Sequence, residues 1–369
     1  MRRSGFLCFG AAVLLGLALS AVAGGERRFL YVAVPGVRNY LERGGHGLLV
    51  FDIDDGHRFV KRIACRGLNS ESKPENVKGI CANAATGLVH IATLTKLQCL
   101  DLVSDGLKWE RAYPGGCDRM ALSPDGRTMY LPTLEKDDWH VIDAVTGEVR
   151  GKISPKSGAH NTVWGPAGKA VYCAGLRSPM LTLADPKAPT ILREAGPLSA
   201  PIRPFTVNGS ETLAFCCVND LLGFEVADLE TGKLLHRVEV PGKAFPVARH
   251  GCPSHGIALT PDEREIWVAG AHDRKVHVFD AKSEPPKLLE SIALRDEPGW
   301  VTMSIDGRLA WLSTGEVIDI PSRKIVAALT DEDGRAVHSE KLIEIDFKDG
   351  RPVGAGCQFG LGQVKSRDQ

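Results

Sequence analysis

Short apolar runs separated by polar turns recur along this chain with a spacing of roughly 40 residues. The two clearest copies are "MALSPDGRTMYLPTLEKDDWHVIDAVTGEVRGKI" from Met120 and "IALTPDEREIWVAGAHDRKVHVFDAKSEPPKLLESI" from Ile257. Each copy predicts four short strands, with a Pro-Asp turn after the first strand and an aspartate at the end of the third. One four-stranded unit cannot bury its own faces, so several units must pack around a common axis. The pattern therefore predicts a β-propeller.

Five weaker copies keep the same phase, and they begin at Phe29, Gly79, Thr162, Phe205 and Val301. The copy at Phe29 starts with its second strand, whereas "EKLIEIDF" from Glu340 is an apolar strand without partners of its own. We therefore predict seven blades, with this C-terminal strand closing the ring as the innermost strand of blade one. Closure would remove the strand edges that otherwise invite aggregation. The following "RPVGAGCQFGLG", and residues 352–369 in general, receive no role from the repeat.

The segments "SPDGRTMYLPT…WHVIDAVTGEV" and "TPDEREIWVAG…VHVFDA" resemble the YncE-like, YVTN-repeat family of exported bacterial propellers. The resemblance covers nearly the whole mature chain. It implies an all-β fold, a seven-bladed β-propeller of four-stranded blades. It implies no single activity, because propellers of this shape include lyases, lactonases, electron-transfer partners and pure binding modules.

The N-terminus has the pattern of a secretory signal peptide. Arg2 and Arg3 precede the apolar run "FLCFGAAVLLGLAL", and an A-x-A cleavage site follows at 21–23. The apolar run is too short for an ordinary membrane span. We predict that residues 1–23 are a signal peptide and that 24–369 form one propeller domain, secreted or periplasmic. No membrane span is expected after cleavage, because no other segment is long and apolar enough.

Charge and motifs narrow the function. Lysine plus arginine equal aspartate plus glutamate at 45 each, which argues against a nucleic-acid partner because such binding needs a basic surplus. Ten cysteines are present and one of them, Cys8, lies in the predicted signal peptide. An odd number therefore remains after cleavage, and disulfide formation would leave at least one free thiol. The sequence has no C-x-x-C, G-x-S-x-G, H-E-x-x-H or Walker A motif.

Alignment of the copies at their turns selects one position at the start of each inner strand. These positions hold Lys78, Asp118, His160, Arg203, His255 and Trp300 in blades two to seven, and His338 precedes the closing strand. A packing position would not select charged residues and histidines in this way. Because all inner strands begin at one face of a propeller, called the top here, the selected residues should surround one mouth of the central channel.

Three interpretations of this ring stay open. In the favoured one, Lys78 and Arg203 bind the anionic group of a small acidic or sugar-like ligand, and Asp118, Asn161 and Trp300 complete the site without an assigned catalytic activity. In the second, His160, His255 and His338 bind a divalent transition metal and are the catalytic candidates of a metal-dependent lyase or hydrolase. In the third, the ring residues only bond one another and fill the tunnel, and top-face loops such as 35–47 bind a protein partner. The sequence does not decide whether the protein is an enzyme.

Overall fold

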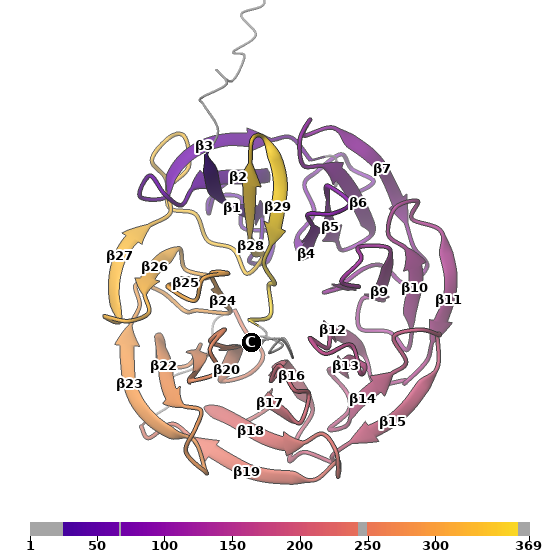
Figure 1. Ribbon diagram of the computed structural model, residues 1–369, viewed down its shortest axis with the longest axis vertical. Helices are drawn as coiled ribbons and strands as arrows, with labels where there is room; N and C mark the ends of the chain where they lie inside the picture. The colour runs from indigo at the N-terminus through magenta and orange to yellow at the C-terminus, as the bar shows by residue number, and fades with distance from the viewer. Residues whose placement is uncertain (1–24, 66–67, 243–248, 361–369) are drawn as a thin grey trace, which may run out of the picture.

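The computed structural model describes residues 25–65, 68–242 and 249–360, so the predicted signal peptide lies outside the described residues. Seven antiparallel sheets stand around a central axis as the blades of a propeller (Figure 1). The predicted fold class, an all-β propeller of seven blades, is confirmed. The described part of the chain contains strands and no helix, and hence no helix that could cross a membrane.

Blades two to seven each consist of four consecutive strands, and the last strand of each lies on the outer rim (Figure 1). Blades two and three contain β4 (Val77–Asn83), β5 (Leu88–Thr93), β6 (Lys96–Asp101), β7 (Leu107–Ala112), β8 (Ala121–Leu122), β9 (Thr128–Pro132), β10 (Trp139–Asp143) and β11 (Val149–Ile153). Blades four and five contain β12 (Ala159–Trp164), β13 (Val171–Gly175), β14 (Leu181–Ala184), β15 (Ile191–Ala195), β16 (Ile202–Val207), β17 (Leu213–Val218), β18 (Gly223–Asp228) and β19 (Leu234–Glu239). Blades six and seven contain β20 (Ser254–Leu259), β21 (Glu265–Gly270), β22 (Lys275–Asp280), β23 (Lys287–Ala293), β24 (Val301–Met303), β25 (Leu309–Leu312), β26 (Glu316–Asp319) and β27 (Lys324–Ala328).

Blade one joins the two ends of the chain. Its strands, in the order in which they pair, are β29 (Arg351–Ala355), β28 (Leu342–Lys348), β1 (Glu26–Val34), β2 (Gly47–Asp52) and β3 (Arg58–Ile63). The pairing of β28 with β1, which sets Ile345 opposite Phe29, confirms that the strand after Glu340 closes the ring. This strand is not the innermost one, however, because β29 pairs with its other edge. Asp349 and Gly350 both have positive φ, 52° and 75°, which allows the tight reversal between β28 and β29.

The chain leaves β29 and runs toward the centre of the ring (Figure 1). We call residues Gly356–Gly360 the C-terminal crossing. The Phe359 ring packs edge-to-face on Trp300 of blade seven, with 5.5 Å between ring centroids. The carbonyl of Gly360 accepts hydrogen bonds from Thr206 Oγ1 at 2.7 Å and Leu259 N at 3.1 Å, in blades five and six. The crossing thus ties blade one to the opposite side of the ring, and this accounts for the unexplained C-terminal segment as far as Gly360.

The apolar core lies mainly between the faces of neighbouring blades. Between blades three and four, Tyr130, Trp139 and Trp164 belong to one buried cluster. The indole N–H of Trp139 donates to Thr162 Oγ1 at 2.8 Å, so this buried polar group is satisfied. Burial of one such large side chain stabilises the fold by about 2–3 kcal/mol, which is why the blades hold together without a shared central core.

Candidate functional site at the top of the channel

Several of the residues selected by the repeat lie at irregularities in the pairing of the inner strands. In four inner strands the pairing register shifts at the selected residue, at Lys78 in β4, His160 in β12, Arg203 in β16 and His255 in β20. A bulge of this kind bends the strand and turns a side chain away from the regular alternation. These four aligned positions are therefore structurally equivalent.

Asp118 and His160 form a buried pair between blades three and four. His160 Nδ1 lies 2.7 Å from Asp118 Oδ2, and Lys78 Nζ lies 3.6 Å from the other carboxylate oxygen. Burial on its own would raise the pKa of Asp118, but His160 and Lys78 hold it below its usual value. Burial lowers the pKa of His160 despite the attraction of the aspartate. An ionised aspartate therefore orients a neutral imidazole whose Nε2 can accept a proton.

Arg119, which the alignment did not select, reaches across the channel. Its guanidinium stacks over the Trp300 ring, 4.1 Å from the ring centroid, and pairs with Glu340 Oε2. Its Nη1 lies 3.5 Å from His160 Nε2. Because Phe359 and Arg119 both pack on it, the fully buried Trp300 supports Arg119 and has no accessible face for a sugar.

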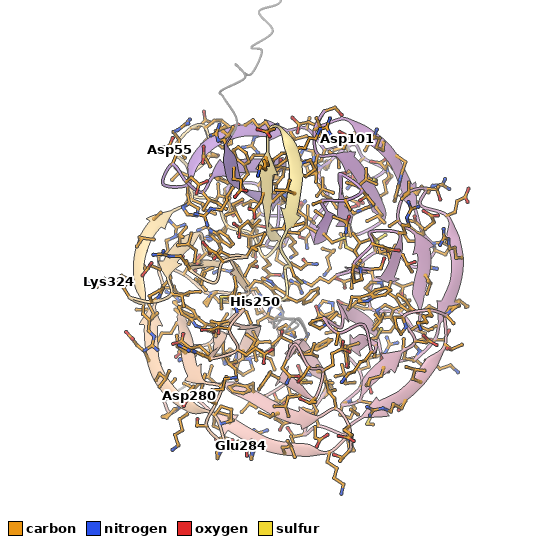
Figure 2. The ribbon with its side chains drawn as sticks, in the orientation of Figure 1. Asp55, Asp101, His250, Asp280, Glu284 and Lys324 are labelled. Carbon is orange, nitrogen blue, oxygen red and sulfur yellow. The ribbon has the colours of Figure 1, made fainter. Side chains whose placement is uncertain are left out.

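Glu340, two residues after His338, joins these groups to a pair of histidines. The rings of His250 and His255 stack with 4.3 Å between centroids, and their Nδ1 atoms lie 3.4 Å and 3.9 Å from Glu340 Oε1. Figure 2 shows His250 near the centre of the ring of blades. Burial lowers the pKa of both histidines, so both imidazoles are neutral near pH 7. Burial opposes ionisation of Glu340 too, yet Lys341 and Arg119 keep its pKa well below the usual value.

Lys341 places a second cation beside the same carboxylate. Its Nζ donates to Glu340 Oε2 and to the carbonyl of Gly36, each at 2.8 Å. Burial lowers the pKa of Lys341 to about 7 although Glu340 attracts its charge, and the nearby Arg119 and Lys78 act in the same direction as burial. A buried lysine with such a pKa is a candidate functional group.

Two of the residues selected by the repeat, His338 and Arg203, lie away from the groups around Asp118 and Glu340. His338 contacts Arg43, with 2.6 Å between Nδ1 and the guanidinium Nη1, and burial lowers its pKa to about 3. Arg203 bonds Asn219 Oδ1 at 2.6 Å and the carbonyl of Gly251 at 3.3 Å, so it supports the loop that carries His250. The 35–47 loop is tied down as well, because Arg38 donates to the Arg249 carbonyl at 2.6 Å. A protein partner for the top-face loops stays a prediction.

Several polar atoms at this level are buried and have no hydrogen-bond partner among the described residues. They are Arg119 Nε, both amide atoms of Asn161, and His250 Nε2. The backbones of Arg119 and Asn161 are joined by a parallel β-bridge, so these two residues are direct neighbours. Since buried polar groups in native proteins are nearly always paired, such a group of unpaired atoms indicates a place where a ligand or water binds.

The structure thus assembles part of the predicted ring and adds to it. The charged layer, as we call Lys78, Asp118, Arg119, His160, Asn161, His250, His255, Glu340 and Lys341, contains five of the predicted residues. Among the described residues, the His, Cys, Asp and Glu side chains close enough to hold one metal ion are His250, His255 and Glu340. Of the three predicted metal ligands, His160, His255 and His338, only His255 belongs to this group. Arg119 directly follows the aligned residue Asp118, and Lys341 directly follows Glu340, where the predicted closing strand begins. Only this adjacency in sequence could have identified them.

All nine cysteines outside the predicted signal peptide are free thiols.

Comparison with known proteins assigns no family: no protein-family model matches the chain, and no curated protein is significantly similar to it.

Proposed function

We propose that this chain is an exported propeller of the YncE-like group that binds a small acidic or sugar-like ligand in the charged layer. The seven-bladed fold supports a ligand-binding function in general terms. The charges of the side chains support an acidic ligand. Lys78, Arg119 and Lys341 supply three cations against the carboxylates of Asp118 and Glu340, which leaves one positive charge for an anionic ligand when Lys341 is protonated.

The observation that carries this proposal is that Arg119 Nε and both amide atoms of Asn161 are buried without a hydrogen-bond partner among the described residues. Arg119 Nε and Asn161 Nδ2 are donors and Asn161 Oδ1 is an acceptor, and a backbone bridge joins the two residues. A carboxylate needs donors, and a neighbouring hydroxyl needs an acceptor and a donor. A hydroxy acid or sugar acid offers both groups within a few bonds, so it would satisfy all three atoms.

The test compares two buried asparagines. Asn161→Leu removes amide atoms that lack partners, so we expect the free energy of unfolding to stay within about 1 kcal/mol of wild type, or to rise. Calorimetric titration with glucuronate, galacturonate and gluconate, and neutral glucose as the reference, should show that the same variant loses binding by at least about tenfold.

Asn208→Leu is the matched control. Asn208 Oδ1 accepts from Thr212 N at 2.8 Å and Leu213 N at 2.9 Å, in a turn at the other end of blade five. Its replacement should destabilise the fold by about 1–3 kcal/mol and leave acid binding unchanged. If no sugar acid or hydroxy acid binds the wild type, or if Asn161→Leu binds it equally well, the proposed function is wrong.

A second candidate function, metal-dependent lyase or hydrolase chemistry, is favoured by the grouping of His250, His255 and Glu340. The residues fit a divalent transition metal in their chemistry, because metal binding requires neutral imidazoles and an ionised carboxylate. His255 Nδ1 donates to the Gly299 carbonyl at 3.1 Å, which leaves a lone pair on Nε2. Glu340 Oε2 pairs with the cations, and Oε1 lies near the histidines. A metal bound here would make a coordinated water or ligand proton more acidic.

Metal titration separates this candidate from simple ligand binding. If it is correct, the full-length protein binds Zn²⁺ or Mn²⁺ stoichiometrically, and Glu340→Gln and His250→Ala each weaken that affinity by about 10- to 100-fold. His140→Ala is the control, because that buried histidine lies outside the group and contacts the Pro114 carbonyl and the Tyr113 ring. Equal affinity in wild type and His250→Ala would eliminate the metal candidate while leaving the acid-binding proposal intact.

A further inference from the structure

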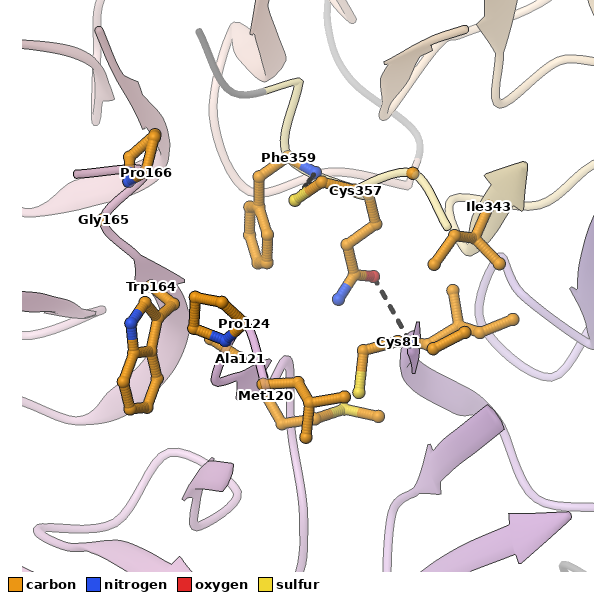
Figure 3. Close-up of a pocket in the computed structure, with 15 residues that line it drawn as sticks. Cys81, Met120, Ala121, Pro124, Trp164, Gly165, Pro166, Ile343, Cys357 and Phe359 are labelled. Atoms are coloured by element: carbon orange, nitrogen blue, oxygen red, sulfur yellow. Dashed lines mark hydrogen bonds between the residues drawn. The ribbon is translucent and has the colours of Figure 1, made fainter. Parts of the chain in front are cut away.

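A pocket of about 200 Å³ lies at the end of the channel opposite the charged layer. The inner strands of blades two, three and four contribute residues from their later parts, among them Ala82, Leu122 and Trp164. The charged residues, in contrast, stand where these strands begin. The C-terminal crossing forms another wall through Gly356, Cys357, Gln358 and Phe359 (Figure 3). The crossing therefore contributes a wall to this pocket and packs, through Phe359, against the Trp300 that supports Arg119.

The walls of this pocket are mostly apolar. Ile80 and Trp164 line it, together with Met120, Ile343 and Phe359, which Figure 3 labels. Pro124, an exposed residue of the turn that follows β8, also lines the pocket. A preformed apolar pocket with few polar groups is the usual form of a small-molecule site. An engineered cavity of 150 Å³ holds benzene, so a pocket of this size accommodates one aromatic ring and a short substituent.

Gln358 supplies the one side-chain amide in this wall. The residue is 2% exposed, and its Oε1 accepts a hydrogen bond from Ile80 N at 3.3 Å, the dashed line in Figure 3. That bond fixes which end of the amide is which. Its Nε2 is buried and has no partner among the described residues. A donor left unpaired in an apolar wall favours a ligand that brings an acceptor, because an unsatisfied buried group is costly.

We propose that this pocket is a second binding site, for a small aromatic compound that carries one hydrogen-bond acceptor such as a carbonyl oxygen. The ring packs between Trp164 and Phe359, and the acceptor receives the N–H of Gln358. This site is separate from the charged layer in position and in chemistry. It would bind uncharged compounds that the charged layer does not recognise.

Two probes of nearly equal shape test the assignment of the acceptor. Acetophenone has the carbonyl, and α-methylstyrene replaces it with a methylene group. Calorimetric titration of the full-length wild type should show acetophenone binding about 5- to 10-fold more tightly, the difference that one hydrogen bond contributes. Gln358→Leu should remove this preference by weakening acetophenone alone. Gln98→Leu, which replaces a buried glutamine of β6 outside the pocket, should retain it.

A second variant tests the location without touching Gln358. Ala121→Leu fills the pocket from its β8 wall and should abolish binding of both probes. Ala281→Leu, at a half-buried position after β22, should bind them like the wild type. Urea unfolding of every variant verifies that it is folded. The proposal fails if folded wild type binds neither probe, if Ala121→Leu still binds them, or if Gln358→Leu keeps the preference for acetophenone.

Discussion

Lys341 shows how much the surroundings of one side chain decide. The amine is buried, bonded to Glu340, and repelled by Arg119 and Lys78. Because Arg119 already pairs with Glu340, the second cation gains less from the carboxylate than its own burial costs. The closing strand has no complete repeat copy of its own, so the alignment gave no reason to single out Lys341. The Asp-x-x-Thr-Gly turn of blade three, in contrast, is held by hydrogen bonds between neighbouring residues. Asp143 Oδ1 indeed accepts from Val145 N at 2.8 Å and Thr146 N at 3.0 Å.

The depressed pKa of Lys341 predicts a pH dependence of stability. Between pH 7 and pH 10.5 the unfolded chain keeps the proton on this lysine and the folded protein does not, so unfolding takes up a proton. The folded protein therefore has its full stability with respect to Lys341 above the unfolded pKa, and it loses stability as the pH falls toward 7. We expect the free energy of unfolding of wild type, relative to Lys341→Met, to rise by about 2–3 kcal/mol between pH 7 and pH 9. Urea unfolding at several pH values measures it, and a pH-independent difference would show that Lys341 keeps an ordinary pKa.

At the scale of single elements, the inner strands could be predicted from the sequence, whereas strand β29 and the C-terminal crossing could not. The start of each inner strand was placed by the turns that follow it, and the bulges at Lys78, His160 and His255 show that the placement was right. Strand β29 was missed although Asp349-Gly350 is a strong hairpin signal. No other blade has a fifth strand, so the repeat argued against it. The crossing has no pattern of its own, because Phe359 and Gln358 are fixed by Trp300 and Ile80 from other blades.

For the whole molecule, we expect closure by β28 to make the ring unfold as one unit. The strand pairs with β1 on one edge and β29 on the other, and Ile345 of β28 is fully buried. It joins residues near the two ends of the chain, such as Leu30 and Glu344. Ile343 and Ile345 of β28 belong to the apolar cluster between blades one and two, so release of β28 would expose the faces of both blades.

A pair of proline substitutions tests the importance of closure. Ile345→Pro removes a ladder hydrogen bond in the middle of blade one and should cost at least about 3 kcal/mol, with loss of a single cooperative transition in urea. Val326→Pro is the control, because Val326 is exposed and sits at the bulge of the outer strand β27, where proline is tolerated. We expect it to cost about 1 kcal/mol or less. If the two variants unfold at the same urea concentration, closure by β28 contributes no special stability.

The number of blades, the closing strand and the positions that begin each inner strand can be predicted from the repeat, because each copy supports the others. Which of these positions meet depends on the packing of the blades. His160 pairs with Asp118 next to it in the ring, His255 stacks on His250 from a preceding loop, and His338 turns away toward Arg43. The tertiary structure also decided that the crossing packs beneath Trp300 and forms a wall of the apolar pocket. These contacts join residues far apart in the chain, and a local pattern carries no information about the partner that another blade supplies.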